Sequence, residues 1–132
     1  MLKDLVIRNR SFRGYDESRK ISEEELLELV DLTRYTASSA NTQPLKYHIA
    51  YEKEEVDAIQ ALTKWAAALP QLSLPYPGQC PTGFIIICLD KSIAPNETAF
   101  LRDIGIAAQT ILLAAAEKDL GGCMIGNFNR AA

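Results

Sequence analysis

Residues 98–119 read TAFLRDIGIAAQTILLAAAEKD, and this apolar stretch decides the fold. Its apolar residues recur three and four positions apart, which predicts a helix that begins at Asn96 or Thr98 and ends near Asp119. Ala107 and Leu113 extend the apolar surface almost all round, so we expect the helix to be buried in the domain or in a subunit interface. The predicted core face consists of Ile104, Ala108, Ile111, Leu112 and Ala115.

Strands are predicted on both sides of this helix. Phe84–Leu89 is a continuous apolar run, which is typical of a central strand that is covered on both faces. Gly121 and Gly122 end the helix. Cys123–Ile125 then predicts a short third strand.

The N-terminal half adds helices and one more strand. Ser22 and Glu25 have the spacing of a capping box, which predicts a helix from about Ser22 to Tyr35. Residues 47–51 alternate between apolar and polar side chains, as a half-buried strand does. Further elements are a short helix before Asn9, a helix over Glu54–Leu69 and a long irregular loop over Pro70–Pro81.

The order of these elements predicts the class of the fold. Helices and strands alternate around a small sheet, which indicates an α+β sandwich in a single domain. A chain of 132 residues has the size of one domain.

Composition excludes several classes of protein. The net charge of −3 is not the basic charge that is typical of proteins that bind nucleic acid. Three cysteines without metal-type spacing favour a reducing compartment. The N-terminus lacks a signal-peptide core, and the apolar stretch Gly105–Ala116 contains Gln109 and is too short to span a bilayer. We therefore expect a cytoplasmic protein without a membrane partner.

The first candidate site is Arg8–Arg13. The guanidinium groups of Arg10 and Arg13 match phosphate oxygens, and the hydroxyl of Ser11 lies between them in the sequence. These residues predict a site for a phosphate monoester. The alternative is a solvated basic turn.

Two further segments carry polar or small residues that could contact the flat ring of a ligand. Ser38–Pro44 contributes the amides of Asn41 and Gln43, which can bond ring carbonyls or nitrogens without adding charge. Gly121–Asn127 allows close approach of backbone to a flat ligand. The alternatives are a plain helix-to-strand loop for the first segment and a helix end followed by a strand for the second.

Other polar residues offer little chemistry. His48 is the only histidine and has no evident partner in the sequence. Cys88 and Cys123 are expected to be small buried apolar residues. Asp103 and Glu117 lie too far apart on their helix to act as a pair.

Taken together and in this order, the segments resemble the nitroreductase-like flavoproteins. Residues 9–15 (NRSFRGY) resemble the RS-x-R-x-[FY] signature, and residues 38–45 (SSANTQPL) resemble the [AS]-S-x-x-N-x-QP segment. Residues 103–109 (DIGIAAQ) are similar to the D-x-G-x-A-x-Q helix of that family, and residues 121–126 (GGCMIG) to the strand that follows it.

The resemblance implies a dimeric three-layer α+β sandwich. A small mixed sheet would have helices on both faces, and FMN would lie at the dimer interface. The chemistry would take place at flavin N5, without a catalytic side chain. By resemblance, the FMN phosphate would be held by Arg10, Ser11 and Arg13; the ring or ribityl chain would lie near Asn41, Gln43 and Pro44; and the N5 side would face the backbone of Ile125, Gly126 and Asn127.

The implied function is FMN-dependent electron transfer from NAD(P)H to a small acceptor such as a nitroaromatic or a quinone. Two features depart from the family pattern. Asn9 stands where many members carry a basic residue, and members usually extend several tens of residues beyond residue 132, with a further strand in that extension. The alternative is a non-catalytic flavin-binding or interaction domain derived from the same family.

Overall fold

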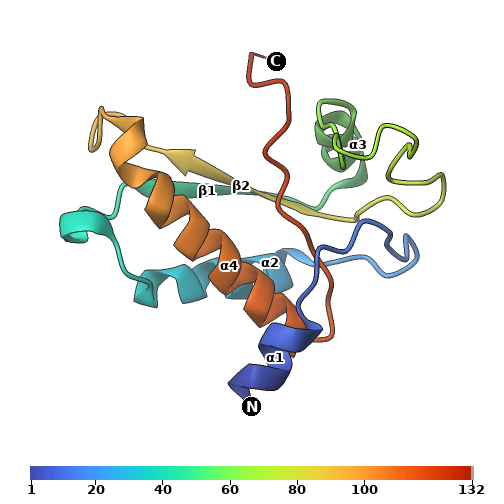
Figure 1. The fold of residues 1–132 in the computed structure, drawn as a ribbon, viewed down its shortest axis with the longest axis horizontal. Helices are drawn as coiled ribbons and strands as arrows, with labels where there is room; N and C mark the ends of the chain where they lie inside the picture. Colours follow the sequence, from blue (N-terminus) through green and yellow to red (C-terminus); the bar gives the residue numbers. More distant parts are fainter. Residues whose placement is uncertain (132) are drawn as a thin grey trace.

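The computed structural model describes residues 1–131, so Ala132 of the expected domain 1–132 lies outside the described residues. Most helices lie on one side of a small sheet, and one further helix lies near an end of the strands (Figure 1). In chain order the elements are α1 (Leu2–Arg8), α2 (Glu23–Asp31), η1 (Leu32–Tyr35), η2 (Ser39–Asn41), β1 (Leu45–Ala50), α3 (Lys53–Ala61), β2 (Phe84–Leu89), η3 (Glu97–Phe100) and α4 (Leu101–Glu117).

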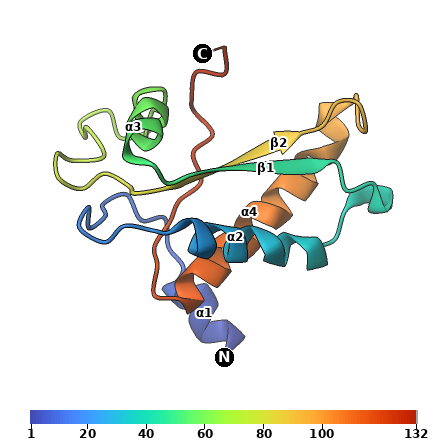
Figure 2. The same cartoon turned by 180° about the vertical axis from the view of Figure 1, so that it is seen from behind.

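Helix α4 is the centre of the core. Its buried face packs against α2 and the inner face of the sheet, and Figure 2 shows both helices on the same side of the two strands. Leu29 of α2 contacts a cluster that includes Ile111, with Tyr47 and Ile85 from the two strands packed against it. The buried residues of α4 are Asp103, Ala107, Ile111, Ala114, Ala115 and Ala116.

Local signals fix the ends of α2. The Ser22 side chain accepts a hydrogen bond from the Glu25 backbone N–H, and the Glu25 carboxylate accepts one from the Ser22 N–H. These two bonds satisfy donors that the first turn of a helix leaves unpaired. The predicted helix over 22–35 is confirmed, with its last turn wound more tightly as η1.

The sheet of the described residues is smaller than the sequence predicts. It has two antiparallel strands, with Leu45 opposite Leu89 and Ala50 opposite Phe84. The predicted strand over Cys123–Ile125 does not form a ladder, so the sheet is antiparallel rather than mixed. A ladder needs a neighbouring strand along its whole length, and the segment after α4 makes only single-residue bridges, to Ser11 and to Thr63.

The predicted helix over 54–69 is too long. Helix α3 ends at Ala61, and the next residues bond to the C-terminal segment. The Lys64 N–H donates to the Asn127 carbonyl at 2.8 Å, and the Asn129 N–H donates to the Leu62 carbonyl at 2.9 Å. Groups used in this way cannot continue the helical ladder.

Strand β2 is not covered on both faces. Most of its residues are half-buried, and Cys88 is exposed, against the expectation that this cysteine is buried. The apolar run therefore indicates a strand correctly but overstates how deeply it lies.

The outer side of α4 is apolar and exposed. Leu101 is 60% exposed and Ile106 is 39% exposed. By length and composition alone the helical segment Glu97–Glu117 could cross a membrane, since its most apolar window has a mean hydropathy of 1.4 and is 33% buried. This segment is longer than the apolar stretch considered in the sequence, because η3 continues directly into α4.

Replacing Leu29 by alanine tests the packing of α4 on α2. Leu29 is 3% exposed, so Leu29→Ala should lower the free energy of unfolding by about 2 to 5 kcal/mol. The control is Leu27→Ala in the same helix, where the side chain is 51% exposed and the change should stay within about 0.5 kcal/mol. Urea unfolding measures both, and equal losses would contradict this description of the core.

Candidate functional site

The first and third candidate segments lie side by side. Ser11 and Gly122 form a parallel bridge, and the Phe12 N–H donates to the Gly122 carbonyl at 3.1 Å. Gly121 makes this approach possible, since a Cβ there would lie 2.8 Å from Cδ2 and 3.2 Å from Cβ of Phe12. Residues separated by over a hundred positions thus form one surface.

An open cavity of about 440 Å³ adjoins this surface. Its volume lies within the usual range for small-molecule sites. It is lined by Val6, Asn9, Arg10, Ser11, Gln109, Leu112 and Met124. The cavity therefore brings the predicted phosphate residues Arg10 and Ser11 next to α4.

The guanidinium groups of Arg10 and Arg13 are available to an anion. Arg13 donates to the Ser11 carbonyl at 3.3 Å, and within residues 1–131 neither arginine forms an ion pair. Arg8 differs, since it bonds the Ala116 carbonyl at the end of α4 and lies 3.2 Å from the Asp119 carboxylate. Arg8 thus stabilises the helix end, whereas Arg13 uses one donor on the Ser11 carbonyl and neither Arg10 nor Arg13 is paired with a carboxylate in residues 1–131.

The second candidate segment is held in an unusual backbone conformation. Ala40, Asn41 and Gln43 have φ values of 51°, 52° and 52°, which is the left-handed region. Such residues cost free energy that the surrounding structure must offset. Asn41 and Gln43 are exposed, and the Gln43 side-chain amide donates to Asn41 Oδ1 at 2.6 Å. Pro44 is fully buried directly after them.

Asp103 anchors this segment to α4. Its carboxylate accepts from Ser38 Oγ at 2.5 Å, from the Ser39 N–H at 3.1 Å and from Ser39 Oγ at 3.1 Å. Burial raises the pKa of Asp103, but the hydrogen bonds from Ser38 and Ser39 outweigh it and hold the pKa below its ordinary value. Asp103 is therefore charged at neutral pH.

Sequence reasoning missed this role of Asp103. The sequence suggests only a pair with Glu117, which the spacing along the helix excludes. The available signal was a carboxylate in the first turn of an otherwise apolar helix, because a charge at such a position needs partners when it is buried. The sequence could not identify Ser38 and Ser39 as those partners.

The two halves of the expected site lie apart in one chain. Asp103 and Gln109 are six positions apart, which is about 9 Å along the helix and about one and two-thirds turns. In both views the segment that holds η2 lies beyond the first turn of α4, whereas α1 and the segment after it lie near its end (Figures 1 and 2). One copy of the chain therefore does not bring Arg10 to Asn41.

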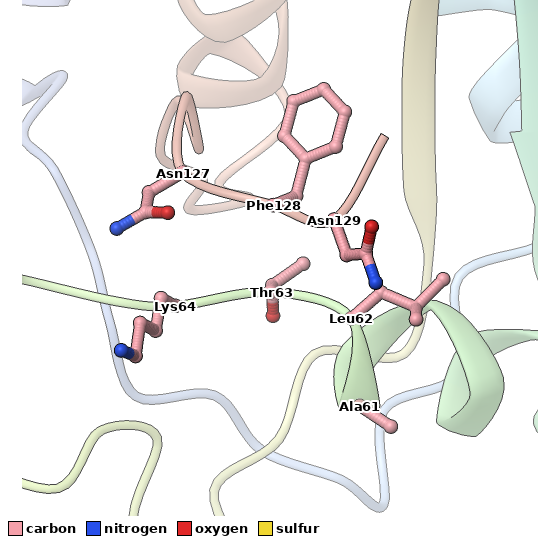
Figure 3. Close-up of a pocket in the computed structure, with 7 residues that line it drawn as sticks. All are labelled: Ala61, Leu62, Thr63, Lys64, Asn127, Phe128 and Asn129. Carbon is pink, nitrogen blue, oxygen red and sulfur yellow. The ribbon is translucent and has the colours of Figure 1, made fainter. Parts of the chain in front are cut away.

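Residues 127–129 line a second cavity, of about 420 Å³, against 61–64 (Figure 3). The Phe128 ring points away from Thr63, and its face lies 5.2 Å from the Arg130 guanidinium carbon. The Thr63 hydroxyl is used within the chain, since it accepts from Trp65 Nε1 at 2.8 Å and donates to the Gln60 carbonyl. Asn127, the last residue of the Gly121–Asn127 segment, is held by the hydrogen bond that its carbonyl accepts from the Lys64 N–H.

His48 forms a surface contact, and Tyr15 forms a partly buried one. His48 Nε2 lies 2.6 Å from Glu55 Oε1 on the outside of the molecule, so it has a partner that the sequence did not reveal. Tyr15 Oη lies 3.6 Å from Cys123 Sγ, and burial together with that neighbour raises the pKa of Tyr15. Among residues 1–131 no group of three metal-binding side chains converges.

Comparison with known proteins decides the family. The sequence pattern that defines the nitroreductase family matches residues 7–132. The chain belongs to the nitroreductase family. That result confirms the resemblance drawn from the four motifs.

Relatives and solved structures agree with the assignment to the nitroreductase family. A Methanothermobacter thermautotrophicus protein, provisionally named NADH dehydrogenase/NAD(P)H nitroreductase, is 26% identical over 90% of this chain and 57% of its own length. A nitroreductase family protein from Streptococcus pneumoniae superposes with a TM-score of 0.78 at 11% identity, over 99% of this chain and 79% of its own. A provisionally named nitroreductase from Desulfovibrio desulfuricans, solved with FMN, gives 0.72 at 22% identity, over 91% and 64%.

Two facts follow for this nitroreductase-family chain. The solved structures confirm the α+β fold. The chain spans little more than half the length of the Methanothermobacter relative that it matches.

Gly121→Ala tests the contact that joins the first and third segments. The new methyl group would collide with Phe12, so the free energy of unfolding should fall by about 1 to 3 kcal/mol. Gly126→Ala is the matched control, because a Cβ there meets nothing within 4 Å and the change should stay within about 0.5 kcal/mol. Urea unfolding compares the two, and a Gly121→Ala protein as stable as the wild type would refute the contact.

Proposed function

We propose that this chain binds FMN and serves in the transfer of electrons from NAD(P)H to a small acceptor such as a nitroaromatic or a quinone. One observation carries the proposal. Arg10 and Ser11 line an open cavity beside the Gly121–Asn127 segment, Arg13 follows two positions later, and within residues 1–131 neither guanidinium group forms an ion pair. The family assignment and the FMN in the Desulfovibrio desulfuricans structure support it.

The donor set fits the phosphate of FMN. Two guanidinium groups and one hydroxyl provide charge-assisted hydrogen bonds to its oxygens. We propose that Arg10, Ser11 and Arg13 hold this phosphate. The nearby Leu112 and Met124 would exclude water from the adjoining part of the cavity.

The flavin ring needs polar groups that add no charge, together with backbone that can approach closely. We propose that Asn41, Gln43 and Pro44 provide the former and that the backbone of Ile125, Gly126 and Asn127 provides the latter. The open space beside Gly126 supports the proposed backbone contact, because no side chain there would keep a flat ligand away.

A homodimer resolves the separation of the two halves. We propose that residues 38–44 of one copy and the Arg10–Arg13 segment of another meet at the interface. The exposed apolar side of α4 supports this, because Leu101 and Ile106 would lose solvent contact in a dimer. The same contact would cover α4, whose composition alone would permit a membrane span. We therefore propose that the dimer lies in the cytoplasm and binds neither a membrane nor nucleic acid.

Bound FMN would supply the redox chemistry of the reaction. The chain's own task is to bind and orient the cofactor and to shape its surroundings. No acid or base is required from a side chain, which agrees with the surface position of His48. The proline-rich segment 70–81 contacts the segment of Tyr15, whose N–H donates to the Gln79 carbonyl at 3.1 Å.

Absorbance of the purified protein after incubation with FMN and desalting tests the cofactor. The wild type should retain flavin, whereas the variant with both Arg10→Ala and Arg13→Ala should lose at least about 90% of it, since each phosphate contact to a charged group contributes about 1.5 to 3 kcal/mol. Arg34→Ala is the control, because Arg34 is on the surface, where it pairs with Asp31 and lies over the Tyr35 ring. A wild-type protein that retains no flavin would refute the proposal.

The same preparation separates electron transfer from binding alone. Oxidation of NAD(P)H on addition of a nitroaromatic or quinone is the expected outcome. Retained flavin with no such oxidation would instead favour a non-catalytic flavin-binding domain, which is the second candidate.

A further inference from the structure

We propose that Asp103 is a positioning residue, which holds the loop 38–44 so that the amides of Asn41 and Gln43 meet the flavin ring. The inference rests on the proposed function and assigns a role to a residue outside the expected cofactor site. Its basis is a pair of linked hydrogen bonds from a buried carboxylate to the backbone of Gln43, whose side chain in turn bonds Asn41.

Burial of the Asp103 carboxylate is unfavourable unless its oxygens accept hydrogen bonds. The residue is 3% exposed on the packed face of α4, among alanines and Ile111. A charge removed from water needs donors in fixed positions. Ser38 and Ser39 provide two hydroxyls and one backbone N–H, all from the same short loop. The carboxylate therefore organises this loop and no other element.

Ser38 extends the effect to the residues that face solvent. Its hydroxyl donates to Asp103 and accepts from the Gln43 N–H at 3.0 Å. The Gln43 side chain then donates to Asn41 Oδ1 at 2.6 Å. Two consecutive hydrogen bonds, which share the Ser38 hydroxyl and so polarise each other, join the carboxylate to the Gln43 backbone. The third bond is made by the Gln43 side chain and fixes the two amides relative to each other.

The loop needs this anchor because its backbone is strained. Three residues other than glycine occupy the left-handed region within four positions, at Ala40, Asn41 and Gln43. Such conformations persist only where the surroundings fix them. On the other side, buried Pro44 is held through its carbonyl by the Asp90 N–H at 2.9 Å. Asp103 and Pro44 thus fix the two ends, and the amides project between them.

The central test compares Asp103→Asn with the wild type for two ligands, FMN and riboflavin. Riboflavin lacks the phosphate, so it reports on ring contacts alone. Asp103→Asn should weaken both ligands by the same factor, at least about tenfold, which corresponds to 1.4 kcal/mol. The variant with both Arg10→Ala and Arg13→Ala should instead weaken FMN and leave riboflavin nearly unchanged. The absorbance shift of bound riboflavin should also be reduced in Asp103→Asn.

Asp16→Asn is the matched control. The Asp16 carboxylate also accepts from a serine hydroxyl and a serine N–H, both of Ser18, but in an exposed turn of another segment. Its affinities for both ligands should stay within about twofold of the wild type, since contacts made by exposed groups contribute little. Equal affinities in Asp103→Asn and Asp16→Asn would overturn the inference.

Hydrogen exchange of the ligand-free protein gives a readout that does not depend on flavin. The backbone N–H groups of Ser39 and Gln43 should exchange faster in Asp103→Asn, while those of the α4 core should not change. Unchanged exchange of the loop would overturn the inference. A wild-type protein that does not bind flavin would refute the proposed function and the role of the loop at the flavin ring. Hydrogen exchange would still decide whether Asp103 holds the loop 38–44 in place.

Ser38 variants keep the test decisive if Asp103→Asn fails to fold. Ser38→Ala removes the central hydroxyl and leaves the carboxylate with the Ser39 donors, so it should reproduce the parallel loss of FMN and riboflavin. Ser38→Thr keeps a hydroxyl at the same position and should restore most of the affinity. Loss in Ser38→Thr equal to that in Ser38→Ala would show that packing alone matters and would contradict the inference.

Discussion

The burial of α4 against α2 and the two strands is the constraint on which the rest of the structure depends. Ile111, Ala114 and Ala115 join Leu29 in the core, and the strand residues pack against that cluster. Small alanines let the helix approach its neighbours closely, and each methyl or larger group that leaves water adds to stability. With α4 fixed in this way, the positions of both candidate site segments follow.

Each segment is attached to a different part of that helix. Asp103, in the first turn of α4, holds the loop that carries Asn41 and Gln43. Gln109 and Leu112, further along, line the cavity beside Arg10 and Ser11. Arg8 bonds the carbonyl of Ala116 at the end and so fixes where the Arg10–Arg13 segment begins. The helix therefore sets the spacing between the proposed phosphate site and the proposed ring contacts, and it keeps them apart within one copy.

Local sequence signals predicted the elements that depend on local interactions. The capping box of Ser22 and Glu25 lies within one turn, and the helical repeat of 98–119 continues through its full length, so both helices were predictable. The apolar run of Phe84–Leu89 likewise indicated a strand with the observed ends. The four motifs indicated the nitroreductase family, which the match over residues 7–132 confirms.

Long-range contacts account for what the sequence did not predict. Helix α3 stops at Ala61 because Asn127 and Asn129 bond to residues just beyond it, more than sixty positions away. The segment after Gly122 makes bridges to two different parts of the chain and so forms no strand. The link between Asp103 and Ser38 also joins distant positions, and spacing within one sequence cannot identify such partners. The site residues named from the sequence remain proposals, and so does their meeting across two copies of the chain.

Subunit mixing tests that central claim most directly. One variant would carry Arg10→Ala and Arg13→Ala, and the other Asn41→Ala and Gln43→Ala, so that neither alone retains FMN. In a mixed two-fold dimer one site carries all four changes and the other carries none, so random exchange should restore about a quarter of the wild-type FMN content. Mixed dimers, verified by native mass spectrometry, that retain no FMN would contradict a site shared between two copies.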